Sequence, residues 1–184
     1  MSTNNSSNVT ASKPSIGGCI FVAPLGTTLP TSTSDALDSA FKNLGYISTD
    51  GITNSNTMSS NDVKAFGGDT VLSTQTDKPD SFKFKLLEVL NVDVLKTVYG
   101  DENVTVGEDG EIAITANSKE LEYKSWVIDM ILRNGTKKRE VIPNGKISSL
   151  ADIVYKDDTA TSYDVTVAAQ PDSDSNTHYE YIKK

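Results

Sequence analysis

Few residues of this chain have the types and spacing that catalysis needs. The single histidine, His178, lies near the C-terminus in a polar stretch. A catalytic histidine needs a positioned nucleophile or carboxylate, and no neighbouring motif supplies one. The sequence also has no phosphate-binding glycine loop and no Gly-x-Ser-x-Gly elbow. We therefore interpret His178 as a surface residue and predict that the chain is not an enzyme, with no catalytic residue and no cofactor.

A metal site is not expected either. Asp172, Asp174 and Asn176 match the opening of a calcium-binding loop. The match then fails, because Thr177 stands where glycine is required and Lys183 where the bidentate glutamate should be. The chain has one cysteine, which excludes an internal disulfide and a cysteine-rich zinc site. We interpret that cysteine, at position 19, as a small core residue.

Composition narrows the class of protein. A chain of 184 residues is expected to form one domain, and a hydrophobic share of 36% predicts a modest core with long surface loops or arms. The net charge of -8 argues against a surface that grips nucleic acid. No stretch approaches 18 apolar residues, and the N-terminus lacks the blocks of a signal peptide. We expect a protein that is cytosolic where it is made and has no membrane anchor.

The elements that would position any site centre on residues 80–100. Phe82, Phe84 and Leu86 alternate with lysines, which predicts a strand with one wet face. The period then changes to three, and the pattern predicts a helix over 91–99 with Asn91 as its N-cap and Gly100 at its end. A helix this short must pack on a sheet.

The other periodic segments are mostly strands. A second short helix is predicted over 35–44, where apolar residues recur at helical spacing. We expect further strands at 17–24, 46–49, 104–106, 112–114, 121–132, 137–143, 147–155, 163–169 and 179–182, with a turn at Asn144-Gly145. This pattern predicts a mainly β fold, a β-sandwich or barrel with a flanking α-helix.

The strand at 121–132 is apolar on both faces, so both faces should be buried, the second by the helix or by another subunit. We place Trp126 in the interior. The following Asn134-Gly135 pair predicts a type I′ hairpin turn. A two-residue turn would set Asp129 opposite Glu140, an unfavourable pair that a bulge near the turn would relieve.

Two long polar stretches have little to bury. Residues 1–16 are either a disordered tail or a flexible arm that orders on a neighbouring subunit. Residues 53–80 are predicted to be a long loop, either disordered or packed on another chain. We favour packing on another chain, because a free loop would leave four apolar side chains exposed to water, those of Val63, Phe66, Val71 and Leu72.

One short segment is strongly acidic. It contains five carboxylates and no basic residue: Asp101, Glu102, Glu108, Asp109 and Glu111. The simpler interpretation is a set of solvated loop charges. The functional alternative is an acidic rim or lining.

Five segments occur along the chain in this order: Phe21-Val22-Ala23-Pro24-Leu25-Gly26-Thr27, Gly45-Tyr46-Ile47-Ser48-Thr49-Asp50-Gly51-Ile52, Lys64-Ala65-Phe66-Gly67-Gly68-Asp69, Val94-Leu95-Lys96-Thr97-Val98-Tyr99-Gly100-Asp101-Glu102-Asn103-Val104-Thr105-Val106 and Pro171-Asp172. Their order and spacing resemble the major tail proteins of long-tailed phages of Gram-positive bacteria, over roughly 17–182. Residues 1–16 match nothing in that pattern.

The resemblance implies a tail-tube β-sandwich domain over 17–184 that closes into hexameric rings, which stack into a tube for genome delivery. It implies tape-measure, tail-terminator and baseplate proteins as partners, with double-stranded DNA as a transient passenger. It also implies a place in the virion after assembly in the host cytoplasm. A negative lumen would let DNA slide. Contractile and non-contractile tails both use this fold. The competing hypothesis is a monomeric β-sandwich module that binds a receptor or glycan.

Overall fold

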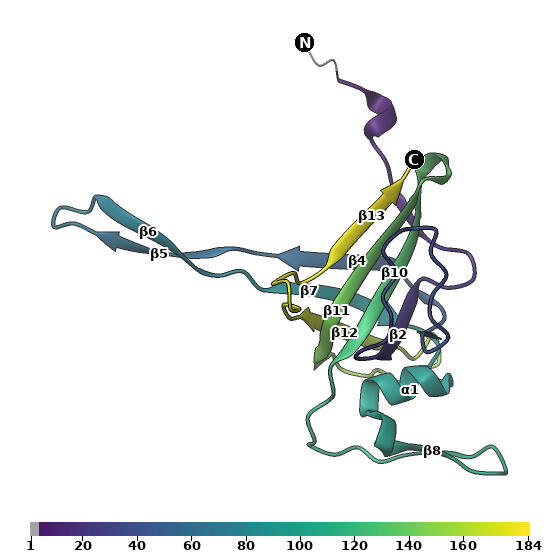
Figure 1. Cartoon of the computed structure of the whole chain (residues 1–184). Helices are drawn as coiled ribbons and strands as arrows, with labels where there is room; N and C mark the ends of the chain where they lie inside the picture. The colour runs from purple at the N-terminus through teal and green to yellow at the C-terminus, as the bar shows by residue number, and fades with distance from the viewer. Residues whose placement is uncertain (1–3) are drawn as a thin grey trace.

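The structure, a computed structural model, describes residues 4–184 and is a mainly antiparallel β fold (Figure 1). The α-helix in these residues is α1 (Val92–Tyr99), and three short 3₁₀ turns are η1 (Ser6–Asn8), η2 (Asp101–Asn103) and η3 (Arg133–Gly135). The strands are β1 (Ser12–Pro14), β2 (Ile20–Pro24), β3 (Lys42–Asn43), β4 (Ile47–Asn56), β5 (Ser59–Lys64), β6 (Thr70–Asp77), β7 (Asp80–Leu86), β8 (Val104–Val106), β9 (Ile112–Ile114), β10 (Lys124–Leu132), β11 (Lys137–Leu150), β12 (Tyr163–Ala169) and β13 (Tyr179–Lys183).

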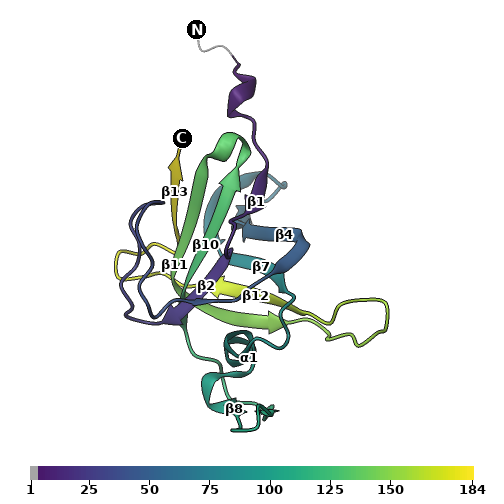
Figure 2. The ribbon, with the colours of Figure 1, turned by 90° about the vertical axis from the view of Figure 1, so that its right-hand side faces the viewer.

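One bent sheet builds the body. Its strand order is β3-β2-β10-β11-β12-β7-β4, with β1 added to β10 and β13 added to β11. The long strand β11 joins the two layers, because its first half pairs with β10 and β13 and its second half with β12. In Figures 1 and 2, β10 and β11 run steeply across β12, β7 and β4, and α1 lies against one end. The predicted β-sandwich with one flanking helix is confirmed.

The core follows the predicted alternation. Phe82, Phe84 and Leu86 of β7 are buried, and Phe84 packs against Trp126 at a ring separation of 6.0 Å. Directly opposite on β12 lie Val167, Val165 and Tyr163, which are also buried. Interleaved polar residues stay at the surface, so this pair of strands has one dry and one wet face.

Helix α1 forms for the local reasons that the sequence predicts. The side chain of Asn91 accepts a hydrogen bond from the backbone N–H of Asp93 at 3.0 Å, as an N-cap does. Val94, Leu95 and Val98 are buried against the sheet. Gly100 ends the helix with a φ of 98°, which favours glycine.

The second predicted helix, over 35–44, is wrong. Residues 25–41 instead form an irregular segment whose Leu37, Ala40 and Phe41 pack on Val127. This segment, and not the helix, covers Val127 on the second face of β10. Its irregular path is fixed by polar contacts that periodicity cannot reveal, above all two carbonyls held by Arg139.

The turn between β10 and β11 is present, but not with two residues. Asn134 and Gly135 both have positive φ, 66° and 78°, as the sequence predicts. The connection is longer by one residue, so Asp129 faces Arg139 and not Glu140. The shift replaces a like-charge pair with an ion pair, which explains the register.

The predicted turn at Asn144-Gly145 is wrong, because β11 continues through it to Leu150. Gly145 is needed there for close approach. A Cβ on Gly145 would lie 2.8 Å from Cδ1 of Trp126, and the indole N–H donates to the Gly145 carbonyl at 3.0 Å. The strand predicted over 147–155 therefore begins inside β11 and ends at Leu150.

Candidate assembly surface

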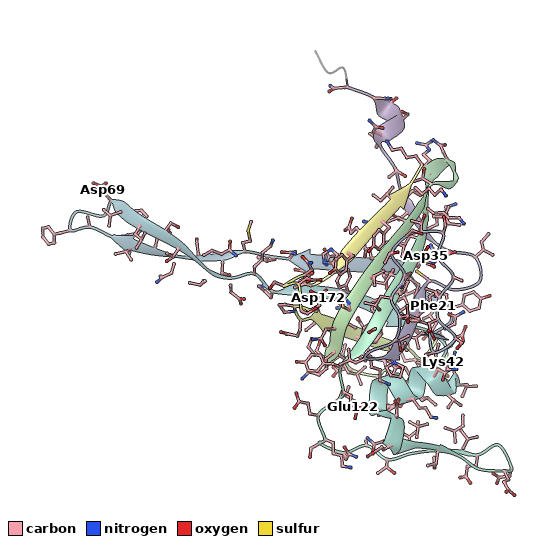
Figure 3. All side chains as sticks on the ribbon, viewed as in Figure 1. Phe21, Asp35, Lys42, Asp69, Glu122 and Asp172 are labelled. Carbon is pink, nitrogen blue, oxygen red and sulfur yellow. The ribbon has the colours of Figure 1, made fainter. Side chains whose placement is uncertain are left out.

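A two-stranded arm projects from the body where a loop was expected. Within 53–80, β4 runs to Asn56, β5 and β6 pair as a hairpin, and β7 begins at Asp80. Strands β5 and β6 extend the β4–β7 ladder away from the sandwich, and Asp69 lies near the tip (Figures 1 and 3). Strand β5 begins with two serines and β6 contains three threonines, and threonine suits a pleated ribbon even without a core.

The four predicted contact residues all lie on this arm and are exposed. Phe66 lies in the tip turn and is 111% exposed, while Val71, Leu72 and Val63 are 63%, 53% and 47% exposed. Val63 sits opposite Leu72, and Val71 is the unpaired residue of a bulge. None of the four belongs to a core cluster. The structure thus gathers them on one projection of the described chain and gives them nothing to pack on.

A buried carboxylate accepts hydrogen bonds where the arm joins the sandwich, at the start of β7. Asp80, 3% exposed, accepts hydrogen bonds from Asn54 Nδ2 at 2.8 Å and Thr177 Oγ1 at 2.6 Å, and its Oδ2 lies 2.5 Å from Nδ1 of His178. Burial alone would raise the pKa of Asp80, but the bonds from Thr177, Asn54 and His178 outweigh it and lower the pKa. Because the ring of His178 also stacks edge-on with Phe82, the interpretation of His178 as a surface residue is wrong.

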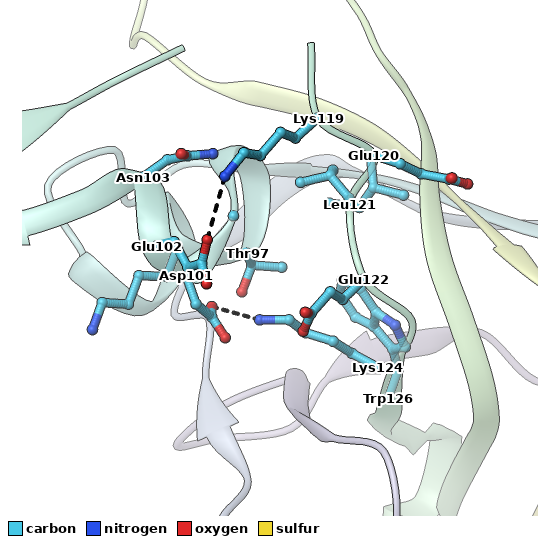
Figure 4. A pocket seen from close by; sticks show the side chains of 13 residues that line it. Thr97, Asp101, Glu102, Asn103, Lys119, Glu120, Leu121, Glu122, Lys124 and Trp126 are labelled. Carbon is cyan, nitrogen blue, oxygen red and sulfur yellow. Dashed lines mark hydrogen bonds and ion pairs between the residues drawn. The ribbon is translucent and has the colours of Figure 1, made fainter. Parts of the chain in front are cut away.

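The acidic segment is divided between two environments. Asp101 pairs with Lys124 at 2.7 Å, and Glu102 approaches Lys119 at 3.5 Å (Figure 4). The other three carboxylates, those of Glu108, Asp109 and Glu111, lie in the exposed β8–β9 hairpin and form no ion pair within residues 4–184. The predicted pairing of β8 with β9 is confirmed.

A cavity of about 360 Å³ lies between α1 and the segment that leads into β10 (Figure 4). The two ion pairs just described join part of its charged lining, Glu120 of the lining pairs with Lys146 outside it, and Trp126 forms part of its wall. Within the described residues, no three His, Cys, Asp or Glu side chains gather as they would around a metal ion. Cys19 is 2% exposed, and burial raises the pKa of its thiol to about 12, as expected for a core residue.

The N-terminal stretch is partly built into the body. Residues 1–3 of the predicted arm lie outside the described residues. Strand β1 pairs with the end of β10, with Ser12 opposite Leu132 and Pro14 opposite Met130. Thr10 Oγ1 also accepts from the backbone N–H of Arg133 at 2.8 Å. The role of this stretch as an arm on a neighbour stays a prediction.

A family described as phage tail tube protein matches residues 1–184, the whole length of the chain. The chain belongs to the phage tail tube protein family. Its place is therefore the virion, and its role is a structural one in the tail tube. None of the curated proteins compared with this tail tube protein matches it. No helix in residues 4–184 has the length and hydropathy of a membrane span.

Two polar centres of this tail tube protein were missed by sequence reasoning. One is the Asp80 cluster, and the other is Arg139, whose guanidinium binds Asp129. Each has a partner about 100 residues away in the sequence, Thr177 for Asp80 and Ser32 for Arg139. The signal available in sequence was an aspartate and an arginine at positions where each strand should be apolar.

Proposed function

We propose that the chain assembles into stacked hexameric rings that form the tail tube, a conduit for genome delivery into the host. The observation that carries this proposal is the projecting β5–β6 arm with its four unpacked apolar side chains. The family makes copies of the same chain the natural partner. We further propose assembly in the cytoplasm of a Gram-positive host and contact with tape-measure, tail-terminator and baseplate proteins, with DNA as a passenger.

The arm is the proposed inter-subunit contact. A side chain such as Phe66 contributes roughly 1.5–3 kcal/mol when it moves from water into an apolar site. Four such residues on one ribbon can therefore hold a neighbour, whereas in a lone subunit they lower its solubility. The acidic residues Asp101, Glu102, Glu108, Asp109 and Glu111 are proposed to form a negative rim.

The monomeric binding module has weaker support. The single tryptophan, Trp126, is 2% exposed, and its N–H donates to the Gly145 carbonyl. A glycan platform needs an exposed ring, so Trp126 cannot serve as one.

Electron microscopy of the purified full chain tests the proposal. We expect rings or tubes for the natural chain. The triple variant Phe66→Ser/Val71→Ser/Leu72→Ser should stay folded, because these side chains contact no core residue, yet remain monomeric. Tyr155→Ser is the matched control, since Tyr155 is 76% exposed and lies outside the arm. A natural chain that stays monomeric at every concentration would refute the proposal.

A further inference from the structure

Three lysines lie in one cross-strand row at one end of the sheet, with Ile131 between the first and the second. Lys13 of β1 is opposite Ile131 of β10, Ile131 is opposite Lys137 of β11, and Lys137 is opposite Lys183 of β13. Residues directly opposite one another in a sheet project from the same face. We call Lys13, Lys137 and Lys183 the basic row. All three are exposed, and Arg133 lies in the turn at the same end.

The basic row has no carboxylate partner in the part of the chain that the structure describes. Within residues 4–184, the only side-chain hydrogen bond of the row is from Lys183 Nζ to Ser34 Oγ at 3.1 Å. The adjacent Lys138 differs, because it is held between Glu140 at 2.9 Å and Glu180 at 3.1 Å. Like charges directly opposite each other destabilise a sheet. The stability of the lone subunit therefore does not explain the row.

A cluster of the opposite sign lies at the other end of the molecule. Glu108, Asp109 and Glu111 occupy the β8–β9 hairpin, and we call these three residues the acidic turn. Figures 1 and 2 both place β8 at one end of the sandwich, beyond α1, and β1, β13 and the C-terminus at the other. The two unpaired clusters thus lie at opposite ends of the molecule and cannot meet within one subunit.

We propose that the acidic turn of one subunit docks on the basic row of the next, end to end. This inference rests on the proposed tube, and it assigns the charges of the rim to the contact between rings. A surface at one end that matches a different surface at the other makes a heterologous contact, which repeats along an axis. Complementary charges at such a contact set its register and speed its formation.

A second copy fits the basic row better than a nucleic acid does. The chain itself carries the matching carboxylates, three against three. Its net charge of -8 repels phosphate at long range, and the row is a small exception on an acidic molecule. Binding of DNA to the basic row is the alternative that the charge-reversal experiment distinguishes.

Charge reversal in the full chain tests the inference. The first variant is Lys13→Glu/Lys137→Glu/Lys183→Glu, the second is Glu108→Lys/Asp109→Lys/Glu111→Lys, and the third combines all six changes. Each of the first two should raise the protein concentration needed for tubes by at least tenfold, since about 1.4 kcal/mol lost at the contact is a factor of ten. The third restores complementarity and should recover tubes. High salt should also weaken tubes of the natural chain.

A control variant makes the same change in net charge elsewhere, at lysines outside the arm that form no ion pair within residues 4–184: Lys42→Glu/Lys96→Glu/Lys156→Glu. It should assemble as the natural chain does. Tube length is measured by negative-stain microscopy and sedimentation, with circular dichroism to check folding. If a charge-reversal variant does not fold, glutamine at the same positions removes the charges instead. The protein concentration needed for tubes should then also rise, but by less.

The outcomes separate two failures. A natural chain that forms neither rings nor tubes refutes the proposed function. The end-to-end contact alone is overturned if tubes form equally well with either cluster reversed. It is also overturned if the variant with all six substitutions folds but does not recover tubes. Double-stranded DNA that binds natural rings and is released by reversal of the basic row, with tubes unaffected, would assign the row to nucleic acid instead.

Discussion

Replacing Arg139 with methionine should destabilise the subunit and release residues 25–41 from the body. The guanidinium is buried and holds Asp129 in a two-point contact, with Nε 2.6 Å from Oδ1 and Nη2 2.8 Å from Oδ2. Its Nη1 also donates to the carbonyls of Ser32 at 3.0 Å and Asp35 at 2.8 Å. One side chain therefore joins β10, β11 and the segment that covers Val127.

The cost follows from what Arg139→Met leaves behind. Asp129, whose side chain is only 20% exposed, loses its partner, and removal of one member of such a pair costs about 3–5 kcal/mol. Two carbonyls lose their donor as well. Arg139→Lys keeps the charge but not the planar fork, so its cost should be intermediate. Asp129→Leu combined with Arg139→Met should recover most of the loss.

Urea unfolding followed by fluorescence of the single tryptophan measures these changes in free energy, at a protein concentration where the chain is monomeric. Lys119→Met is the control, because Lys119 and Glu102 form an ion pair whose side chains are 73% and 87% exposed, and such a pair should contribute less than about 1 kcal/mol. Amide hydrogen exchange should accelerate across 25–41 in Arg139→Met alone. A loss below about 1 kcal/mol with unchanged exchange there would refute the reasoning.

Three further changes are tested by the same unfolding assay. The pKa of Asp80 lies below its ordinary value of 3.8, so the unfolded chain binds a proton first on acidification; the stability from Asp80 is present above about pH 4 and is lost below it, and Asp80→Asn should flatten this loss. Gly145→Ala should cost about 1–3 kcal/mol, since its Cβ would press on Trp126. Asn91→Ala removes the cap of α1 and should cost about 0.5–2 kcal/mol without changing the rest of the fold.

Features set by neighbouring residues could be predicted from the sequence. The helix α1 depends on Asn91 and on an apolar stripe within one turn, and β7 and β12 depend on alternation that is complete within seven residues. The same logic located Trp126 in the core. Each of these decisions is local, so no knowledge of the fold is needed.

Features set by distant contacts could not. Apolar spacing at 35–44 suits a helix, yet Arg139, about 100 residues away, holds the segment in another path. Asn144-Gly145 has the composition of a turn, but glycine is needed at 145 because the Trp126 ring leaves no space for a Cβ there. The polar arm has too few apolar residues for their alternation to predict its strands. For the candidate site, the four apolar residues of the arm could be selected by sequence, whereas the division of the acidic segment depends on Lys119 and Lys124.

The arm has a consequence for how the stability of this protein must be measured. A lone two-stranded ribbon is marginal in water, because it lacks a third strand or a helix to shield it. Calorimetry of dilute subunits should therefore register the melting of the sandwich and miss the ribbon, whose amides will exchange with solvent far faster than those of β7. In the proposed contact, ordering of the ribbon is coupled to binding of a neighbouring subunit. A melting temperature measured on isolated subunits should therefore lie below that of the assembled tube.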